Sequence, residues 1–346
     1  MKINENTGYT FDDVLLVPQH SDIVSRKKIN TETRITKKKW INIPIVASNM
    51  DTITDRKMMI EMDRIGGLAV LHRFMPNKNI LGHISAAINA TSDIYPAFSV
   101  GVNDDYSEIL DAIYSMEIEE QCIVFVDIAH GDCDRVVNLV KNIKKKWKKI
   151  DIVAGNVATP SATKKLIKAG AVGIKVGIGP GSMCTTRLVT GHGIPQLTAI
   201  AECSKVARRY AVPVIADGGI RHSGDIVKAL AAGADCVMIG SLFAGCEETP
   251  GDLIREGTKR VKKYRGMASR DAMMGWKNDS ETTPEGESVT VLRRGPVKKI
   301  INNLMGGVRS GMSYTGAHSV LELQINAEFR VVSSSTIIEN KAHGKD

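Results

Sequence analysis

The sequence has little of several features that identify whole classes of proteins. It contains six cysteines in 346 residues, and none of them stands in a C-x-x-C pair. So few cysteines exclude a disulfide scaffold, offer no zinc-site spacing and favour a reducing compartment, so we expect a cytoplasmic protein. No apolar run approaches the roughly 18 residues of a membrane span, and the N-terminus lacks a signal-peptide core. We therefore expect no membrane partner.

Positive charge is the one compositional excess. The formal net charge is +8, and lysines cluster at 37–39 and 141–149. The second cluster lies on a helix predicted to begin near Asp134, whose inner face is apolar through Val136, Val137, Leu139, Val140 and Ile143. A solvated outer face therefore explains these lysines better than a nucleic-acid site, although an RNA-binding strip is the non-enzymatic alternative. A basic protein also attracts phosphorylated small molecules.

Short apolar segments bounded by Gly, Asn, Asp or Pro recur along the chain and predict buried strands. They lie at 43–47, 68–71, 97–102, 122–128, 151–157, 173–178, 212–216 and 236–239. Amphipathic helical patterns separate them at 55–65, 106–116, 161–169, 199–210 and 224–232, and 75–95 forms a single helical connection. Eight strand–helix units over about 200 residues are the count of a (β/α)8 barrel, the TIM-barrel fold.

A doubly wound open sheet is the alternative fold. It usually has fewer strands and a G-x-G-x-x-G sequence after the first, where this chain reads SNMDTIT. We therefore predict a single α/β domain over residues 1–346, a (β/α)8 TIM barrel. Its N-terminal segment, residues 1–40, is expected to pack across one end of the barrel.

Polar residues follow most of the predicted strands immediately. They occur at 48–51, 72–73, 127–131, 155–156, 177–187, 217–219 and 240–241. In a barrel all these strand ends meet at one face, where active sites are built. Structural turns are also polar and rich in glycine, but they do not require repeated Asn, Asp, His and Cys. The convergence therefore predicts an active site.

One of these segments, GIGPGSMCTTR at 177–187, has the composition of a ligand loop. Its glycines and proline forbid a helix and permit backbone angles that other residues resist. Cys184 stands in it among the hydroxyls of Ser182, Thr185 and Thr186, with Arg187 next along the chain. A thiol near hydroxyl donors and a cation is suited to act as a nucleophile. From these residues alone, a structural cysteine on a glycine turn is as good an interpretation as a nucleophile.

The ends of the last two strands suggest a nucleotide. Asp217-Gly218-Gly219 and Gly240-Ser241 occupy the usual phosphate site of a barrel, where backbone N–H groups with the Ser182 and Ser241 hydroxyls could hold a dianion. The Asp217 carboxylate would repel phosphate and better suits the two hydroxyls of a ribose. As an isolated pattern, DGG is explained about as well by a plain loop.

Taken together, these segments resemble the IMP dehydrogenase and GMP reductase superfamily. The resemblance covers about 9–317 and is carried by GIGPGSMCTTR, AGNVAT at 154–159, ADGGIRHSGDIVKALAAGAD, MIGSLFAG and YRGM at 264–267. It implies a (β/α)8 barrel assembled as a homotetramer, with GMP or IMP as ligand. It also implies that Cys184 is the nucleophile and forms a covalent thioimidate with C2 of the purine.

The resemblance further implies where each ligand binds. The nucleotide would contact Ser182, Asp217, Gly218, Gly219, Gly240, Ser241 and Tyr264, with its base near Gly266 and Met267. The nicotinamide cofactor would contact Asp127, Ala129, Asn156 and Ser269, with Asp127 on the carboxamide and Asn103 as a further helper. A monovalent cation, typically potassium, would be held by the carbonyls of Gly179, Gly181 and Cys184.

The superfamily contains two activities that share the thioimidate. Dehydrogenases transfer hydride from IMP to NAD and hydrolyse the thioimidate to XMP, using a base on a long flap that bears an adjacent Arg-Tyr. Reductases expel ammonia from GMP and then deliver hydride from NADPH to give IMP. Here the flap, about 266–290, is short and has no Arg-Tyr pair. Arg209-Tyr210 is such a pair, but it ends a helix away from the catalytic face.

Other residues bear on the same choice. Asn49 in SNMDT, Ile128 in DIAHG and the lack of an inserted pair of CBS modules within 75–95 favour the reductase. The segments HRF, MASRDAM and RLVTGHGIPQLTAI resemble dehydrogenases as much as reductases. Asp132 also counts against the reductase, because it replaces a polar residue that often follows HG in the family. We therefore expect NADPH-dependent reduction of GMP to IMP in purine salvage. An IMP dehydrogenase without CBS modules is the alternative.

The resemblance assigns the remaining catalytic roles. Glu285, in TPEGES, and Thr186 would shuttle the proton that ammonia needs in order to leave. Without the resemblance, Glu285 reads as an exposed turn carboxylate after Pro284.

Overall fold

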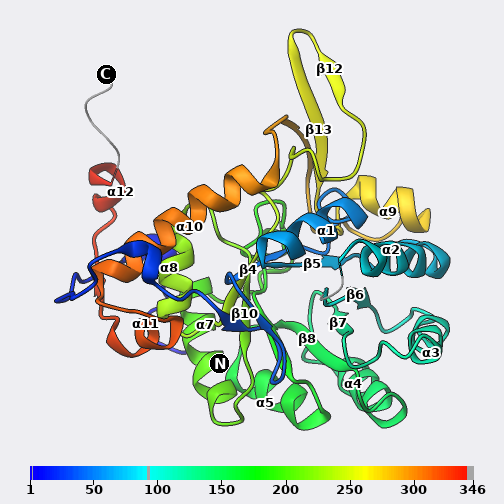
Figure 1. Ribbon diagram of the computed structural model, residues 1–346, viewed down its shortest axis with the longest axis horizontal. Coiled ribbons are helices and arrows are strands. Elements are labelled where there is room, and N and C mark those ends of the chain that lie inside the picture. Colours follow the sequence, from blue (N-terminus) through cyan, green and yellow to red (C-terminus); the bar gives the residue numbers. More distant parts are fainter. Residues whose placement is uncertain (2, 92–93, 341–346) are drawn as a thin grey trace.

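The computed structural model describes residues 1, 3–91 and 94–340. Eight parallel strands close into a barrel in chain order, as the sequence predicts (Figure 1). They are β4 (Ile45–Ala47), β5 (Leu68–Leu71), β6 (Ala97–Val100), β7 (Ile123–Asp127), β8 (Asp151–Val157), β9 (Gly173–Val176), β10 (Val214–Asp217) and β11 (Cys236–Ile239). The closing pair is β11 with β4, which excludes the open sheet.

Helices cover the outside of this barrel. Those that alternate with the strands are α1 (Arg56–Ile65), α2 (Asn77–Ala90), α3 (Ser107–Ser115), α4 (Asp134–Lys146), α5 (Pro160–Ala169), α7 (Gln196–Arg208) and α8 (Ser223–Ala231), and α10 (Val297–Tyr314) lies between α8 and α1. Their limits follow local chemistry. The Asp55 carboxylate caps α1 by accepting from the N–H groups of Lys57 and Met58, and left-handed Gly66 ends the helix. In the described residues between β5 and β6 the one helix is α2, which agrees with the expected lack of inserted CBS modules.

The N-terminal end of the barrel is closed and apolar. A small hairpin, β2 (Thr33–Arg34) and β3 (Trp40–Ile41), brings Ile35 and Ile41 against the inward side chains of the barrel strands, such as Phe125 and Met238. Here Lys39 Nζ lies 2.8 Å from Asp151 Oδ2, and both side chains are buried. The Thr36 hydroxyl also donates to Asp151. This end is therefore a packed plug.

The first part of the N-terminal segment packs at the opposite end of the barrel, where Thr10, Phe11 and Asp12 line the cavity, whereas its last part, from β2 onward, belongs to the plug. Its first turn, η1 (Phe11–Asp13), contacts α8, and Lys228 Nζ donates to the Phe11 carbonyl at 2.8 Å. The chain continues into β1 (Val14–Leu16), which pairs with β15 (Phe329–Val331) near the C-terminus. The sequence does not predict this pairing. The remaining short elements are η2 (Arg26–Lys28), α6 (Thr186–Thr190), α11 (Val320–Asn326) and α12 (Thr336–Glu339).

A three-stranded antiparallel sheet, which the sequence also does not predict, stands outside the barrel. It consists of β12 (Ile254–Glu256), β13 (Lys259–Arg265) and β14 (Ser288–Leu292), and the hairpin of β12 and β13 projects from the body of the molecule (Figure 1). The short α9 (Arg270–Lys277) lies between β13 and β14. The predicted flap at 266–290 is therefore anchored at both ends by strands of this sheet.

The lysine-rich helix α4 matches the prediction of a solvated face. Val136, Leu139, Val140 and Ile143 are buried, while lysines in its last turns face outward. Lys146, at the end of the helix, pairs with Asp111, and Lys149, beyond the end of the helix, pairs with Glu119 and Glu120. None of the helices in the described part of the chain has the length and apolar character to cross a bilayer.

Candidate active site

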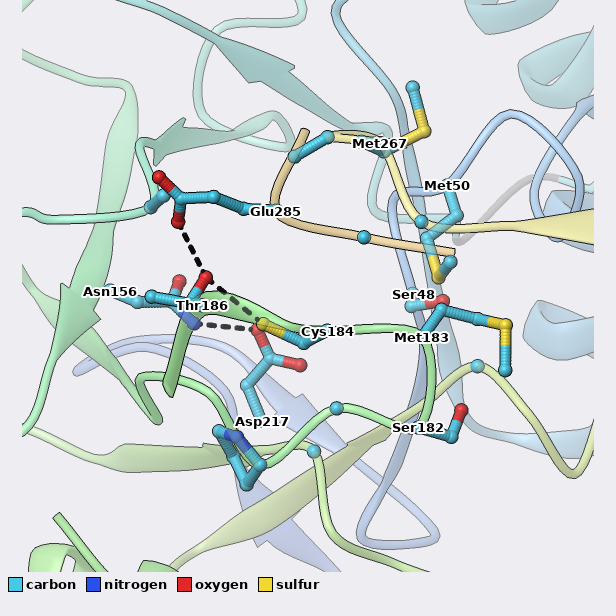
Figure 2. Close-up of a pocket in the computed structure, with 18 of the residues that line it drawn as sticks. Ser48, Met50, Asn156, Ser182, Met183, Cys184, Thr186, Asp217, Met267 and Glu285 are labelled. Atoms are coloured by element: carbon cyan, nitrogen blue, oxygen red, sulfur yellow. Dashed lines mark hydrogen bonds between the residues drawn. The ribbon is translucent and has the colours of Figure 1, made fainter. Parts of the chain in front are cut away.

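A cavity of ≈ 730 Å³ opens at the carboxyl ends of the barrel strands (Figure 2). Most of the predicted site residues line it: Asp127, Ala129, Asn156, Gly181, Ser182, Cys184, Thr186, Asp217, Gly218, Gly219, Gly240, Ser241, Tyr264, Gly266, Met267 and Glu285. They come from β7, β8, β9, β10, β11, β13 and the flap. The barrel therefore brings the polar residues at its strand ends together in one cavity, as the sequence predicts.

The cysteine loop has a backbone that only glycine can supply at two points. Gly177 and Gly179 have φ of 145° and 82°. A Cβ at Gly177 would approach the Asp217 carbonyl to 2.2 Å. The Arg187 guanidinium donates to the carbonyls of Ile178 and Ile194, the second at 2.7 Å. The Arg187 side chain therefore holds the loop by binding its backbone carbonyls. The sequence suggests only that Arg187 lies near the thiol and does not predict this role.

Cys184, Thr186 and Glu285 form one hydrogen-bonded chain within the cavity (Figure 2). The Cys184 thiol donates to Thr186 Oγ1 at 3.2 Å, and the Thr186 hydroxyl donates to Glu285 Oε2 at 2.7 Å. Glu285 is therefore a cavity residue and not the free turn carboxylate that its sequence alone suggests. The arrangement can carry a proton between the carboxylate and a group bound at the sulfur.

Backbone hydrogen bonds support these three side chains, although Thr186 and Glu285 are 99 residues apart in the sequence. The Thr185 N–H donates to the Glu285 carbonyl and the Glu287 N–H to the Met183 carbonyl, both at 2.9 Å. Gly286 lies between them, where a Cβ would meet the Met183 carbonyl at 3.0 Å. The flap is thus joined to the nucleophile loop as a short antiparallel bridge.

The opposite side of the cavity is suited to a phosphate. Ser182 Oγ and Tyr264 OH lie 3.0 Å apart, and burial raises the pKa of the Tyr264 phenol, so it stays a neutral donor. Gly218 and Gly219 adopt left-handed angles, with φ of 91° and 84°. Their backbone N–H groups can therefore approach an anion without an intervening side chain.

A buried lysine that the sequence reading missed lies at the centre of the site. Lys175 Nζ is 2.6 Å from Asp217 Oδ2 and 2.8 Å from Asp127 Oδ1. The Asn156 amide donates to the same Asp217 oxygen at 2.9 Å and to the Gly177 carbonyl at 2.7 Å. The available signal was a lysine inside an otherwise apolar strand, in GIKVG. Such a charge is rarely buried without carboxylate partners.

A second missed cluster joins the flap to the barrel. The Asp51 carboxylate after β4 accepts from Arg265 Nε at 3.0 Å and from Trp276 Nε1 at 2.7 Å. The Trp276 ring packs on His72, with ring centroids 5.4 Å apart. Burial lowers the pKa of His72 to about 4, a shift that the Asp51 carboxylate only partly offsets. We call these four residues the flap latch.

Two residues predicted near the cofactor do not line the cavity. Ser269 is 1% exposed, and its hydroxyl caps α9 by accepting from the Ala272 N–H. The Asn103 side chain accepts a hydrogen bond from Arg135 on α4. Arg73, by contrast, lines the cavity beside Asp127 and pairs with Asp104 at 3.1 Å. Within the described residues, no three His, Cys, Asp or Glu side chains gather as a metal site would require.

The fold is a closed (β/α)8 barrel with a cavity at its carboxyl face, and this cavity contains a hydrogen-bonded thiol and is suited to a phosphorylated ligand. Comparison with known proteins narrows the class of protein. The sequence model of the IMP dehydrogenase / GMP reductase domain matches residues 8–343. The chain therefore belongs to the IMP dehydrogenase / GMP reductase family, and it is an oxidoreductase.

Proteins named as IMP dehydrogenases and proteins named as GMP reductases are both similar to the chain over nearly its whole length. An inosine-5'-monophosphate dehydrogenase of Cryptosporidium parvum is 38% identical, with 98% of this chain and 96% of that protein covered. A GMP reductase of Leishmania major is 31% identical, with 97% and 96% covered. The crystal structure of a GMP reductase variant from Trypanosoma brucei, in complex with guanosine 5'-monophosphate, superposes with a TM-score of 0.88 at 31% identity, covering 98% of each chain.

Proposed function

We propose that the protein is an NADPH-dependent GMP reductase, which converts GMP to IMP and ammonia. The observation that carries this proposal is the hydrogen-bonded chain of Cys184, Thr186 and Glu285. An amine is a poor leaving group unless it is protonated, and this chain places a proton relay directly at the nucleophilic sulfur. We place the reaction in a reducing compartment such as the cytoplasm, because the thiol must stay free.

The first half of the reaction uses the chain's own residues. GMP would lie with its phosphate at Ser182, Gly219 and Ser241 and its ribose hydroxyls on Asp217. The Cys184 thiol passes its proton through Thr186 to the Glu285 carboxylate, and the sulfur adds to C2 of the guanine. Glu285 then returns this proton through Thr186 to the exocyclic amine, the C–N bond breaks, and ammonia departs. The product of this half is a thioimidate between the cysteine and the purine.

The second half reduces that thioimidate. Bound NADPH supplies a hydride to C2. Asp127, Ala129 and Asn156 line the part of the cavity in which the nicotinamide would lie, with the Asp127 carboxylate accepting from its carboxamide. The C–S bond then breaks, the thiolate is regenerated, and IMP is released.

The flap supports reduction over hydrolysis. Hydrolysis of the thioimidate needs a base that activates water. The arginine of this flap has another role, because Arg270 Nη1 donates to the Ser280 carbonyl at 2.8 Å. Arg265, at the end of β13 just before the flap, binds Asp51 through its side chain. The chain's Arg-Tyr pair, Arg209-Tyr210, ends α7 just before β10 and so lies at the opposite end of the barrel.

We also propose a potassium ion on the cysteine loop, held by the carbonyls of Gly179, Gly181 and Cys184. Among the described residues, no backbone N–H donates to the carbonyls of Gly179 or Cys184, and that of Gly181 accepts from the Cys184 N–H at 3.0 Å. Backbone carbonyls without carboxylates suit a weakly charged, easily dehydrated cation. The ion would hold the loop in its open curve.

A homotetramer is proposed as the working assembly. Leu188 and Val189 on α6, directly after the cysteine loop, are 87% and 46% exposed in the single chain. Apolar side chains at the mouth of a polar site are typical of a surface that another protomer covers.

The competing assignment is an IMP dehydrogenase without CBS modules, and the relatives of that name favour it. One assay separates the two. With GMP and NADPH we expect loss of absorbance at the reduced-nicotinamide band and formation of IMP and ammonia. With IMP and NAD we expect no reduced cofactor. The reverse pattern would assign the dehydrogenase activity.

A further inference from the structure

The two carboxylates assigned to different ligands share one cation. Asp127 ends β7, Asp217 ends β10, and both line the cavity. The proposed function assigns Asp127 to the cofactor and Asp217 to the nucleotide. Lys175, on β9, contacts both, at 2.8 Å and 2.6 Å. Its side chain is 3% exposed, while those of Asp127 and Asp217 keep 25% and 22% of their surface open. The lysine is thus enclosed and the carboxylates are accessible.

The electrostatics of the cluster keep Lys175 and Asp127 charged. Burial disfavours the charged form of Lys175, but the two carboxylates outweigh it and raise the lysine pKa. Burial alone would raise the pKa of Asp127. Lys175 and, more weakly, Arg73 reverse that effect and lower it. Removal of the ammonium would leave two carboxylates confronting each other in a partly dry site, which strongly favours protonation of one of them.

The contacts also fix which oxygens remain for ligands. Lys175 and the Asn156 amide both bind Oδ2 of Asp217, and Lys175 binds Oδ1 of Asp127. These contacts of Asp217 are therefore to one oxygen, and the other can be offered to the cavity. Asp127 is held by Lys175 and by a hydrogen bond from the Asn49 side chain. A carboxylate held in this way loses little rotational freedom when a hydroxyl or an amide N–H binds to it.

We propose that Lys175 is a positioning residue shared by the nucleotide and cofactor subsites, because its ammonium orients one carboxylate toward each ligand. This inference rests on the proposed function for the identity of the two ligands. It goes beyond that function in linking the subsites through one buried charge.

A purely structural role is the competing explanation, and the chain contains a matched control for it. Lys39 and Asp151, at the closed end of the barrel, form a pair at 2.8 Å whose lysine is buried almost as completely as Lys175. Lys39 lies in the hairpin plug and not in the cavity lining. Lys39→Met should therefore reproduce the loss of a buried ion pair without touching either ligand.

The first experiment compares wild type, Lys175→Met, Lys175→Arg and Lys39→Met. Calorimetric titration gives the Kd of GMP without turnover, and steady-state kinetics give both KM values. For Lys175→Met we expect the Kd of GMP and the KM of NADPH to rise about 10-fold or more each, with partial recovery in Lys175→Arg. Lys39→Met should change neither by more than about twofold. An effect on one ligand alone, or equal effects from both methionine variants, would overturn the proposal.

A pH profile gives a readout that a structural role would not move. In Lys175→Met the acid limb of kcat/KM should shift to higher pH, because the two carboxylates now share a proton. An unshifted limb in the folded variant would contradict the inference.

The double variant Lys175→Met, Asp127→Asn restores the net charge of the cluster, and so it remains testable if the single variant does not fold. It should recover GMP affinity but not NADPH affinity; failure to recover GMP binding would refute the shared role. If wild type binds GMP yet turns over only IMP with NAD, the proposed function fails while the GMP affinities still test Lys175.

Discussion

The two ends of the barrel each contain a buried lysine paired with carboxylate, but one end is closed and the other opens into a cavity. The N-terminal end buries a lysine–carboxylate pair, Lys39 and Asp151, under a hairpin and fills the remaining space with apolar side chains. The C-terminal end also buries a lysine, Lys175, but surrounds it with carboxylates that stay open to a cavity of ≈ 730 Å³. One end excludes water and the other is built to admit ligands.

The two ends differ in which groups satisfy their buried polar atoms. At the closed end the carboxylate also accepts from the Thr36 hydroxyl, so protein groups satisfy it. At the open end, Ser48 Oγ and Asn156 Oδ1 are buried with no hydrogen-bond partner among the described residues. Buried polar atoms without partners are costly unless a ligand or water completes them. Stability is therefore concentrated at one end and chemistry at the other.

The largest expected effect that separates the two ends is that of Cys184→Ala. Because the sulfur forms the covalent bond to the purine, this variant should lose more than about 10⁴-fold in kcat. Its thermal unfolding should match wild type, since Cys184 is only half-buried. Turnover assays and calorimetry check both statements. Residual activity within about tenfold of wild type would remove the cysteine from the mechanism.

Replacement of the relay carboxylate should cost less. Glu285→Gln keeps the shape of the side chain but cannot deliver a proton through Thr186, so kcat should fall by about 10²–10⁴-fold. The exposed neighbour Glu287→Gln is the matched control and should retain wild-type turnover. Single-turnover measurement of ammonia release locates the loss. A Glu285→Gln enzyme that releases ammonia at the normal rate would exclude the relay.

The closed end should respond in stability alone. Lys39→Met leaves Asp151 buried without its cation, which costs about 3–5 kcal/mol in the free energy of unfolding. Urea titration measures this loss, and kinetics at a temperature where the variant is folded should be those of wild type. If Lys39→Met changed KM but not stability, the assignment of a purely structural role to the closed end would be wrong.

The smallest effect concerns the flap latch at low pH. The pKa of His72 is lowered to about 4 by burial, so the unfolded chain binds more protons than the native state below pH 6.5. Stability should therefore fall as the pH drops from 6.5 to 4, by up to about 3 kcal/mol. His72→Phe keeps a ring against Trp276 and cannot titrate, so its stability should be flatter over this range. Equal slopes for the two proteins would show that His72 is not the titrating group.

Much of the barrel could be predicted because its strands are short, apolar and punctuated. The predicted bounds of β5, β8 and β11 coincide with those in the structure. The antiparallel pairs were missed for a physical reason. β12, β13 and β14 are largely exposed and carry little alternation, and β1 pairs with β15, more than 300 residues away along the chain. Local pattern contains no signal for such contacts.

The site shows the same division. Residues that follow strands, such as Asp217 and Cys184, were predictable because a barrel brings strand ends together. Glu285 could be placed only through the family resemblance, since its own neighbours indicate a turn. Lys175 and the flap latch were missed because their roles depend on side-chain partners from distant elements. Ser269 was expected at the cofactor, but a serine at the start of a helix satisfies the backbone first.

The most direct test of the account follows the fate of the carbon bonded to Cys184. The enzyme is incubated with GMP and NADPH in water labelled with the heavy isotope of oxygen, and the nucleotides are analysed by mass spectrometry. The account predicts IMP with no label at C2, together with one ammonia per NADPH consumed. XMP that carries the label at C2 would show that water, and not hydride, resolves the thioimidate, and would contradict it.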